Sequence, residues 1–300
     1  MPESATAGTL AELVKDWQPP VVATSRRVDP WPAAAFADLV DAEHPATGDG
    51  DPLPPLWHWL LLLPHPRTSE IGDDGHPAEG PFLPPIPGRR RMAAGGRLHR
   101  YGDIPFGAVL HSRSSVASVT PKAGRSGEML FVTVRSELTV GHSTAGTSSS
   151  GVVAVEEQDF VYRSEPEGTP RRRTPRPDTG EPEPDAQWRL RLPTDSVLLS
   201  RFSALTYNGH RIHHDHPYTT TVEGYPDLVI HGPLMALLAL ELPRRHAPHD
   251  RVSAVEYRLS RPAFLPSPIV ATGDRDGDQA AITVAAEGAK PSLTATVRFR

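Results

Sequence analysis

The sequence has 300 residues, 38% of them apolar, and a formal net charge of −5 at pH 7. This length suffices for one large domain or for two of ordinary size. The absence of cysteine excludes disulfides, Cys-ligated zinc and a thiol nucleophile, and an acidic chain without a basic, aromatic-rich patch is not typical of a nucleic-acid-binding protein.

The N-terminal segment does not resemble a targeting signal. Residues 1–14 (MPESATAGTLAELV) contain two acids and no basic stretch that leads into an apolar core, so they do not form a secretory signal. The longest purely apolar run, residues 60–63, is far shorter than the ~20 residues that a membrane-spanning helix needs. We therefore expect a cytoplasmic protein with no membrane partner.

The first half begins with two expected helices. Residues 30–42 (PWPAAAFADLVDA) favour a helix with Asp29 as its N-cap and proline in its first turn. Residues 54–63 (PPLWHWLLLL) are apolar on almost every side, a pattern typical of a helix buried all round. Runs rich in β-branched and aromatic residues then predict strands at 96–101, 108–120, 128–139 and 151–162.

Residues 164–185 (SEPEGTPRRRTPRPDTGEPEPD) form the clearest linker, because proline and charge without apolar residues cannot build a core. Its three consecutive arginines, 171–173, are expected to be solvated. The predicted organisation is an N-terminal domain at residues 1–163, this linker, and a C-terminal domain at residues 186–300.

The second half repeats the order of the first. Apolar segments at residues 188–192 and 197–202 precede a polar, histidine-rich stretch. Residues 231–242 (HGPLMALLALEL) predict a second helix buried all round and ended by Pro243. Strands are expected at 252–259, 268–274, 280–286 and 293–299. The fold class is therefore α+β, with two antiparallel sheets that each wrap a buried helix.

The residues suited to chemistry gather in the second half. Five of the fourteen histidines lie between His210 and His231. Residues 203–215 (SALTYNGHRIHHD), here called the histidine loop, offer imidazoles for proton transfer near neutral pH. His231 and Gly232 open the second buried helix, where free backbone N–H groups can receive an oxygen that gains negative charge.

At these residues the chain resembles the MaoC-like hydratases and type 2 hydroxyacyl-thioester dehydratases. That family carries the pattern S-G-D-x-N-P-[LI]-H-x-D and a later H-G that opens a helix, and residues 203–205, Ile212, His213 and Asp215 fall where the pattern expects them. Segments of the first half are similar to the subgroup that contains mesaconyl-CoA hydratases: residues 53–59, 82–98, 124–134 and 154–163. The resemblance extends from about residue 31 to residue 299.

The resemblance implies a double hot-dog fold and the hydration of an enoyl thioester, or the reverse dehydration, without a metal or other cofactor. It implies His213 as acid/base, the Gly232 N–H as an oxyanion donor, and Asn208 and His210 as further catalytic residues. In one position the chain departs from the family: Asn208 stands where a general-base Asp is usual, five residues before His213. Substrate-binding roles are expected for His231, Arg211 and Asp215.

Several alternatives stay open. The spacing of the histidines is also that of a metal site, although we expect that no metal is bound there. A hot-dog thioesterase and a non-catalytic acyl-thioester-binding subunit are the rival functions, and Asn208 is the best argument for the second. The expected partner is an acyl-CoA or acyl-carrier-protein thioester. The two fused halves would pair as an internal pseudo-dimer, in a chain that is either a monomer or part of a homo-oligomer.

Overall fold

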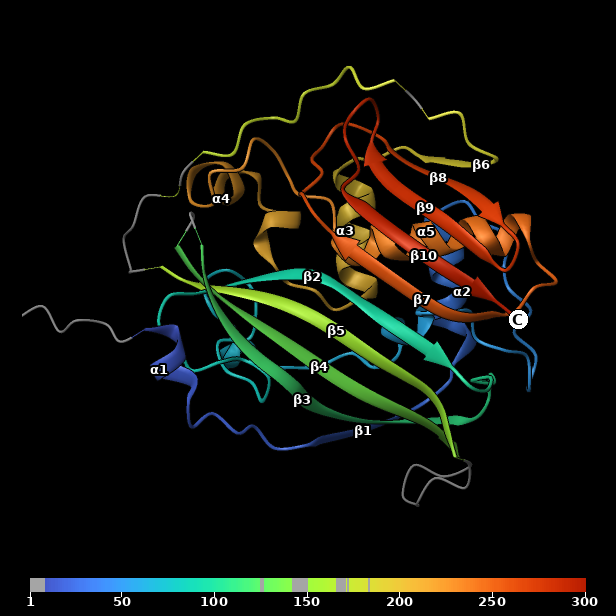
Figure 1. Cartoon of the computed structure of the whole chain (residues 1–300), viewed down its shortest axis with the longest axis horizontal. Helices are drawn as coiled ribbons and strands as arrows, with labels where there is room; N and C mark the ends of the chain where they lie inside the picture. The colour runs from blue at the N-terminus through green and yellow to red at the C-terminus, as the bar shows by residue number, and fades with distance from the viewer. Residues whose placement is uncertain (1–8, 125–126, 142–150, 166–170, 172, 183) are drawn as a thin grey trace, which may run out of the picture.

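The computed structural model describes residues 9–124, 127–141, 151–165, 171, 173–182 and 184–300. Within these ranges, ten antiparallel strands form one continuous sheet in the order β1-β3-β4-β5-β2-β7-β10-β9-β8-β6 (Figure 1). Inward from either edge the two halves have the same order, so the repeated plan expected from the sequence is present. The strands are β1 (Val22–Arg27), β2 (Arg89–Arg100), β3 (Val109–Gly124), β4 (Gly127–Gly141), β5 (Val152–Ser164), β6 (Trp188–Leu192), β7 (Val252–Leu259), β8 (Ile269–Asp276), β9 (Gln279–Ala286) and β10 (Leu293–Phe299).

The predicted strands are confirmed, and the sequence analysis missed one. All eight predicted runs coincide with strands of the sheet, and the apolar segment at residues 188–192 forms β6. The missed strand is β1, which lies at an edge of the sheet and pairs only with β3 among the described strands. Its sequence, VATSRR, lacks the alternation of apolar and polar residues by which strands are recognised.

In the second half, β7–β10 curve around the long helix α5 (Gly232–His246), as Figure 1 shows. All residues from Leu234 to Pro243 are buried, which explains why all of them except Glu241 are apolar. The helix does not stop at Pro243, as predicted, but continues for one more turn. Ion pairs of Arg244 and Arg245 with the buried Glu241 hold that turn.

The buried helix predicted at residues 54–63 is absent. Only a short 3₁₀ turn, η1 (Trp57–Leu60), forms there, although Trp57 and Leu60 are buried as expected. Prolines bound the segment on both sides, and Leu56 adopts a left-handed conformation with φ of 66° that interrupts a helix. The apolar pattern reported burial correctly, but it did not determine the backbone conformation.

The other helices are short. The helix α2 (Pro30–Leu39) packs on α3 (Ser196–Leu205) where the halves meet, with the Phe36 and Phe202 rings 6.4 Å apart. No helix in the described part of the chain is long and apolar enough to cross a membrane. The remaining helical elements are α1 (Leu10–Val14), α2 (Pro30–Leu39), η2 (Thr68–Glu70), α3 (Ser196–Leu205), η3 (Arg211–His213) and α4 (His216–Thr221).

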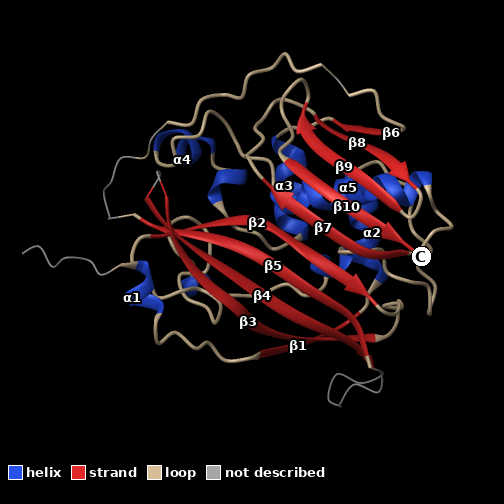
Figure 2. Cartoon of the chain, in the orientation of Figure 1, coloured by secondary structure: helices blue, strands red, loops and turns tan. Residues whose placement is uncertain are grey.

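The two halves are joined by the pairing of β2 with β7, visible in the middle of Figure 2. Gly96 of β2 lies opposite Tyr257 of β7. A Cβ atom at Gly96 would lie 2.6 Å from the Glu157 carbonyl oxygen and 2.8 Å from the Tyr257 hydroxyl. Glycine is therefore required where the tyrosine ring crosses the strand.

Apart from Ser164, the last residue of β5, the predicted linker lacks helices and strands in its described part, but it is anchored to the second half. The Thr174 N–H donates to the Gly224 carbonyl, and the Arg176 guanidinium donates to the Leu265 carbonyl and pairs with Asp227. Arg171, which was expected to be solvated, instead forms an ion pair with the buried Glu223. Residues 166–170, 172 and 183 lie outside the described ranges.

Because α5 fills the second half, its core should be sensitive to lost volume. Leu237 is fully buried in α5, whereas Val197 on α3 is 61% exposed. We expect Leu237→Ala to lower the free energy of unfolding by about 2–5 kcal/mol, measured by chemical denaturation, and Val197→Ala to change it little. Equal effects of the two substitutions would contradict this description of the core.

Candidate active site

His213 lies at the end of η3 and points into the protein. Its side chain is 7% exposed, and Nδ1 is 2.7 Å from the Val229 carbonyl oxygen. Since a carbonyl can only accept, Nδ1 carries the hydrogen and Nε2 has a free lone pair. Burial lowers the pKa of His213 to about 3. The ring is therefore neutral at physiological pH and can accept a proton at Nε2.

His231 is the N-cap residue of α5 and stacks on His213, with ring centroids 3.6 Å apart. Its Nε2 is 2.9 Å from the Ser203 hydroxyl of α3, and its Nδ1 is buried without a hydrogen-bond partner among the described residues. Burial, then the neighbouring His213, places the pKa of His231 well below its ordinary value. His231 therefore fixes the plane of the His213 ring as a neutral group.

Gly232 follows His231 and begins α5. Its backbone N–H has no acceptor within the described ranges, and Pro233 after it has no N–H. A Cβ atom at Gly232 would approach a methyl group of Leu259 to 3.0 Å. The start of the helix thus offers a free N–H beside the two stacked rings, where an oxygen that gains negative charge can be stabilised.

Asn208 lies in the turn between α3 and η3. Its Oδ1 accepts the His210 backbone N–H at 3.0 Å, and its own backbone N–H donates to the Ser203 carbonyl. The side-chain oxygen therefore holds the turn. The residue lines the same cleft as His213, so the amide nitrogen remains available to a ligand.

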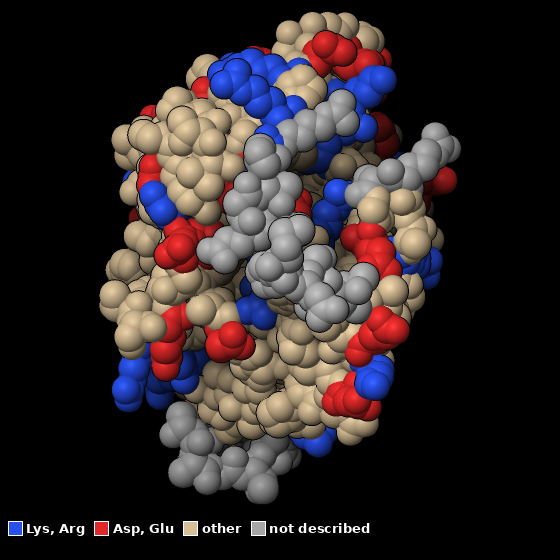
Figure 3. Space-filling view, turned by 90° about the vertical axis from the view of Figure 1, so that its left-hand side faces the viewer, with Lys and Arg blue, Asp and Glu red and all other residues tan. Residues whose placement is uncertain are grey.

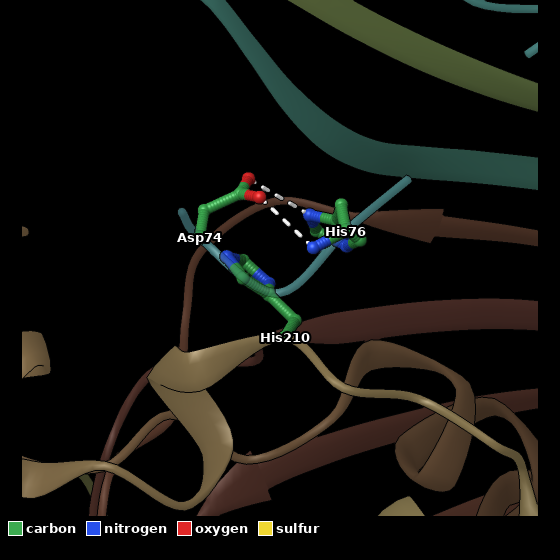
Figure 4. Close-up of side chains that lie close together, drawn as sticks. All are labelled: Asp74, His76 and His210. Atoms are coloured by element: carbon green, nitrogen blue, oxygen red, sulfur yellow. Dashed lines mark hydrogen bonds and ion pairs between the residues drawn. The ribbon is translucent and has the colours of Figure 1, made fainter. Parts of the chain in front are cut away.

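His210 extends the row of rings outward. Its centroid is 5.5 Å from that of His213 and 3.9 Å from that of His76, a residue of the first half. Burial and the neighbouring histidines lower the pKa of His210 to about 2. Figure 4 shows His210 beside His76 and Asp74, with Asp74 directed at His76.

The acidic loop, residues 73–76 of the first half, brings Asp74 and His76 to this place. The Asp74 carboxylate accepts from His76 Nδ1 at 3.1 Å and from the His76 backbone N–H at 2.9 Å. Burial alone would raise the pKa of Asp74, but the bonds and charge of His76 hold it well below the ordinary value. Asp74 is therefore ionised and fixes the orientation of the His76 ring.

The donor atoms of Asp74, His76 and His210 all lie within 4.8 Å of one another. Two imidazoles and a carboxylate at such distances are also the donor set of many metal sites. However, the Asp74 carboxylate is already hydrogen-bonded to His76 Nδ1, so the two residues have the arrangement of a carboxylate–imidazole dyad.

Backbone contacts hold the acidic loop against the histidine loop. The Arg211 N–H donates to the Asp74 carbonyl at 2.9 Å, and the Arg211 guanidinium donates to the Asp73 carbonyl at 2.9 Å. Gly75, with φ of +87°, touches Gly209 so closely that a Cβ atom on Gly75 would lie 1.9 Å from the Gly209 carbonyl oxygen. The two loops can meet in this way only because both residues are glycine.

Arg211 and Asp215, expected to bind substrate, are engaged within the protein. The guanidinium donates to the Asp215 carboxylate at 2.7 Å and lies 3.9 Å from the Tyr218 ring centroid. A hydrogen bond from the Tyr218 N–H and the pair with Arg211 hold the pKa of Asp215 below its ordinary value. Both side chains brace the loop and α4, and their predicted substrate contact stays a prediction.

A cleft of about 3100 Å³ runs from these histidines along the concave face of the first-half strands. It exists where the first half has only η1 in place of a long helix. On the face of Figure 3, which looks from the left of Figure 1, Lys and Arg side chains lie among Asp and Glu. Apolar side chains make up much of the lining of the cleft, and a group of polar side chains is also present: Thr24, Ser112, Ser114, Ser136 and Gln158.

The structure brings together, at one end of the cleft, the residues predicted from the histidine loop and the start of α5: His213, His231, Gly232, Asn208 and His210. The acidic loop is not among the predicted segments. The available signal was the polar, glycine-containing segment Asp73-Asp74-Gly75-His76. Its proximity to the histidine loop depends on the packing of the two halves, which no local pattern encodes.

Comparisons with known proteins identify relatives along most of the chain. Residues 56–265 match the family described as hydroxyacyl-thioester dehydratase type 2. The chain is 39% identical over 266 residues to a protein from Chloroflexus aurantiacus named mesaconyl-C(4)-CoA hydratase. That alignment covers 89% of this chain and 90% of the relative.

Solved structures agree on the fold. A MaoC-like dehydratase from Phytophthora capsici superposes with a TM-score of 0.67 at 15% identity, covering 96% of this chain and 97% of the other. A Mycobacterium tuberculosis protein described as having a double hot-dog fold superposes with a TM-score of 0.55 at 14% identity, covering 98% and 99%. The double hot-dog fold predicted from the sequence is confirmed.

The burial of neutral His213 predicts a pH-dependent stability. Because the pKa of His213 is about 3 in the folded protein and ~6.5 in an unfolded chain, the unfolded state binds more protons in this interval. The free energy of unfolding should therefore fall as the pH decreases from about 6.5 toward 3, by up to about 1.4 kcal/mol per pH unit for this residue. Chemical denaturation at several pH values should give a shallower slope for His213→Asn, and an unchanged slope would contradict the burial of a neutral ring.

Proposed function

The chain belongs to the family of type 2 hydroxyacyl-thioester dehydratases, and on that premise we propose how it adds water to the double bond of an enoyl-CoA and catalyses the reverse dehydration. Such an enzyme is a hydro-lyase. The observation that carries this function is the neutral His213, which stacks on the residue before Gly232. Among the described residues, neither His213 Nε2 nor the Gly232 N–H has a hydrogen-bond partner. This pairing of a base with an oxyanion donor is what hydration of a conjugated thioester needs.

In the hydration direction, His213 Nε2 takes a proton from water while the water oxygen bonds to the β-carbon. The π electrons move toward the thioester, whose oxygen gains negative charge and accepts a hydrogen bond from the Gly232 N–H. A proton is then delivered to the α-carbon. Acid–base assistance of this kind accelerates a reaction by ~10²–10⁴, and one oxyanion donor contributes ~3 kcal/mol.

Asn208 and His210 are proposed to complete the site beside His213. Asn208 holds the turn through Oδ1, which leaves its Nδ2 hydrogens for the attacking water. An amide takes no proton from water at neutral pH, so Asn208 can orient the water but cannot activate it. His231 would act as a positioning residue for the His213 ring rather than by contact with substrate.

One part of the cleft offers hydroxyl groups to the polar atoms of a small acyl group. Ser112, Ser114 and Ser136 are linked through their hydroxyls at 3.2 and 2.7 Å on the concave face of the first half. We propose a short, dicarboxylic enoyl-CoA such as mesaconyl-CoA, which agrees with the name of the Chloroflexus relative.

Arg91 is the proposed receptor for the second carboxylate. It lines the cleft on β2 with its guanidinium carbon 4.1 Å from the Phe160 ring centroid. No carboxylate in the described residues forms an ion pair with it, and its charge reaches His210. A guanidinium with no acidic partner suits a bidentate contact with a substrate carboxylate.

The proposed organisation retains the three segments inferred from the sequence: a first-half domain at residues 1–163, a linker at residues 164–185 and a catalytic domain at residues 186–300. The first half would be a degenerate copy that shapes the acyl site and serves as internal partner of the second. A location in the cytoplasm and the coenzyme A form of the substrate, rather than the acyl-carrier-protein form, belong to the same proposal.

His213→Ala should lower kcat for hydration of an enoyl-CoA by about 10²–10⁴, because the base proposed to take the proton from water is lost. The loss of the conjugated enoyl-thioester absorbance measures turnover, and circular dichroism checks the fold. Full activity in the variant would contradict the proposal. Release of free thiol would indicate a thioesterase, and saturable binding without turnover in the wild type would indicate a binding subunit.

Arg91→Gln should raise KM for mesaconyl-CoA by about tenfold to a hundredfold, since a hydrogen bond to a charged group contributes ~1.5–3 kcal/mol. Crotonyl-CoA has no second carboxylate, so its KM should change by less than about threefold. Steady-state kinetics with both substrates measures the difference. An equal increase for both would place Arg91 at a part of coenzyme A that the substrates share.

A further inference from the structure

The histidine loop lacks a carboxylate that could share the proton chemistry with His213. Asn208 stands in the expected position, and the remaining acid of the loop, Asp215, is bound by Arg211 and the start of α4. The depressed pKa values of His213 and His210 mean that neither ring holds a proton well. Hydration nevertheless requires one group that takes a proton from water and another that delivers a proton to the α-carbon.

We propose that Asp74 and His76 of the first half supply this second function, with His76 as the catalytic acid/base and Asp74 as its positioning residue. This inference rests on the proposed hydratase function. Asp74 accepts the His76 Nδ1 hydrogen at 3.1 Å and so assigns proton exchange to Nε2. The side chain of His76 is 25% exposed and lines the same cleft as His213, whereas His213 is 7% exposed.

The position of this dyad is built into the fold. The glycine contact between residues 75 and 209, together with the two Arg211 bonds to the acidic loop, fixes His76 against His210. A contiguous row of rings then leads through His210 to His213. The charged or titratable groups that interact with His76 are Asp74 on its own loop and His210 and His213 of the histidine loop, and Arg91 of β2 acts in turn on His210.

The proton balance of hydration closes with these two groups. His213 Nε2 takes one proton from water, and the resulting hydroxyl oxygen bonds to the β-carbon. His76 Nε2 gives one proton to the α-carbon and becomes neutral. The proton on His213 then passes to His76, so one water is consumed and both groups return to their starting states. Dehydration runs through the same steps in reverse, with His76 removing the α-proton.

The decisive experiment compares four variants of the full chain: His76→Gln, Asp74→Asn, His213→Ala and, as a matched control, His65→Gln. His65 lines the same cleft but contacts Arg26 and Tyr207 instead of the dyad. Hydration of mesaconyl-CoA and crotonyl-CoA is followed across pH 5 to 9. Deuterium exchange at the α-carbon of the hydrated product is measured in heavy water.

We expect His76→Gln to lower kcat by about 10²–10³ and to change KM by less than about threefold. The variant should also lose one limb of the pH profile of kcat, and its rate of deuterium exchange at the α-carbon should fall in parallel. Asp74→Asn should lower kcat by about tenfold to a hundredfold and shift the same limb. His65→Gln should behave as the wild type. If His76→Gln does not fold, Asp74→Asn, which preserves the size of the side chain, gives the same readout.

Three results would overturn the inference. In the first, the His76 and Asp74 variants have the kcat and the pH profile of the wild type, while His213→Ala is inactive. This result would reject the role of the dyad but leave the hydratase function intact. Another is loss of activity in the wild type on treatment with a chelator and its recovery with Zn²⁺, which would assign Asp74, His76 and His210 to a metal ion. The third, no hydration by the wild type with any enoyl-CoA, would reject the proposed function itself.

Discussion

The antiparallel pairing of β2 with β7 is the constraint on which the rest of the molecule depends. It joins two five-stranded sheets into one and thereby sets the position of the first half against the second. The pairing tolerates no side chain at Gly96, because Tyr257 of the opposite strand occupies that space. Once it is made, α2 meets α3 beneath the sheet, and loops from both halves converge at one end of the cleft.

The halves share a topology but differ in how each is filled. In the second half, α5 occupies the concave face of the sheet, so its core is apolar and closed. In the first half, prolines and the left-handed Leu56 restrict the equivalent segment to one 3₁₀ turn, and a cleft remains along the concave face of the strands. The first half thus lacks a helix that its topology does not require, and the space without that helix can hold a ligand. The second half, which keeps its helix, supplies the rigid frame of the site.

Burial sets the protonation state of the histidines in the second half and limits the proton transfers that they can carry out. His213 and His231 are enclosed between α3 and α5, which keeps the rings neutral and fixes the His213 tautomer through the Val229 carbonyl. The same enclosure makes a buried charge costly, so a proton is poorly held there. The ionised Asp74 beside His76 lies farther out, where the cleft is open. In our proposal, the two kinds of environment divide the proton chemistry between the halves.

The sequence by itself determined the strands other than β1, the buried helix α5 and the histidine loop, because their signals are local: β-rich runs, apolar residues on every side, and His213 with its neighbours. It could not determine the backbone of residues 54–63, since an apolar pattern reports burial and not the type of turn. Nor could it place Asp74 and His76, which reach the site only because glycines 75 and 209 allow two distant loops to touch. Contacts between distant segments depend on how complete halves pack, and that information exists only in the tertiary structure.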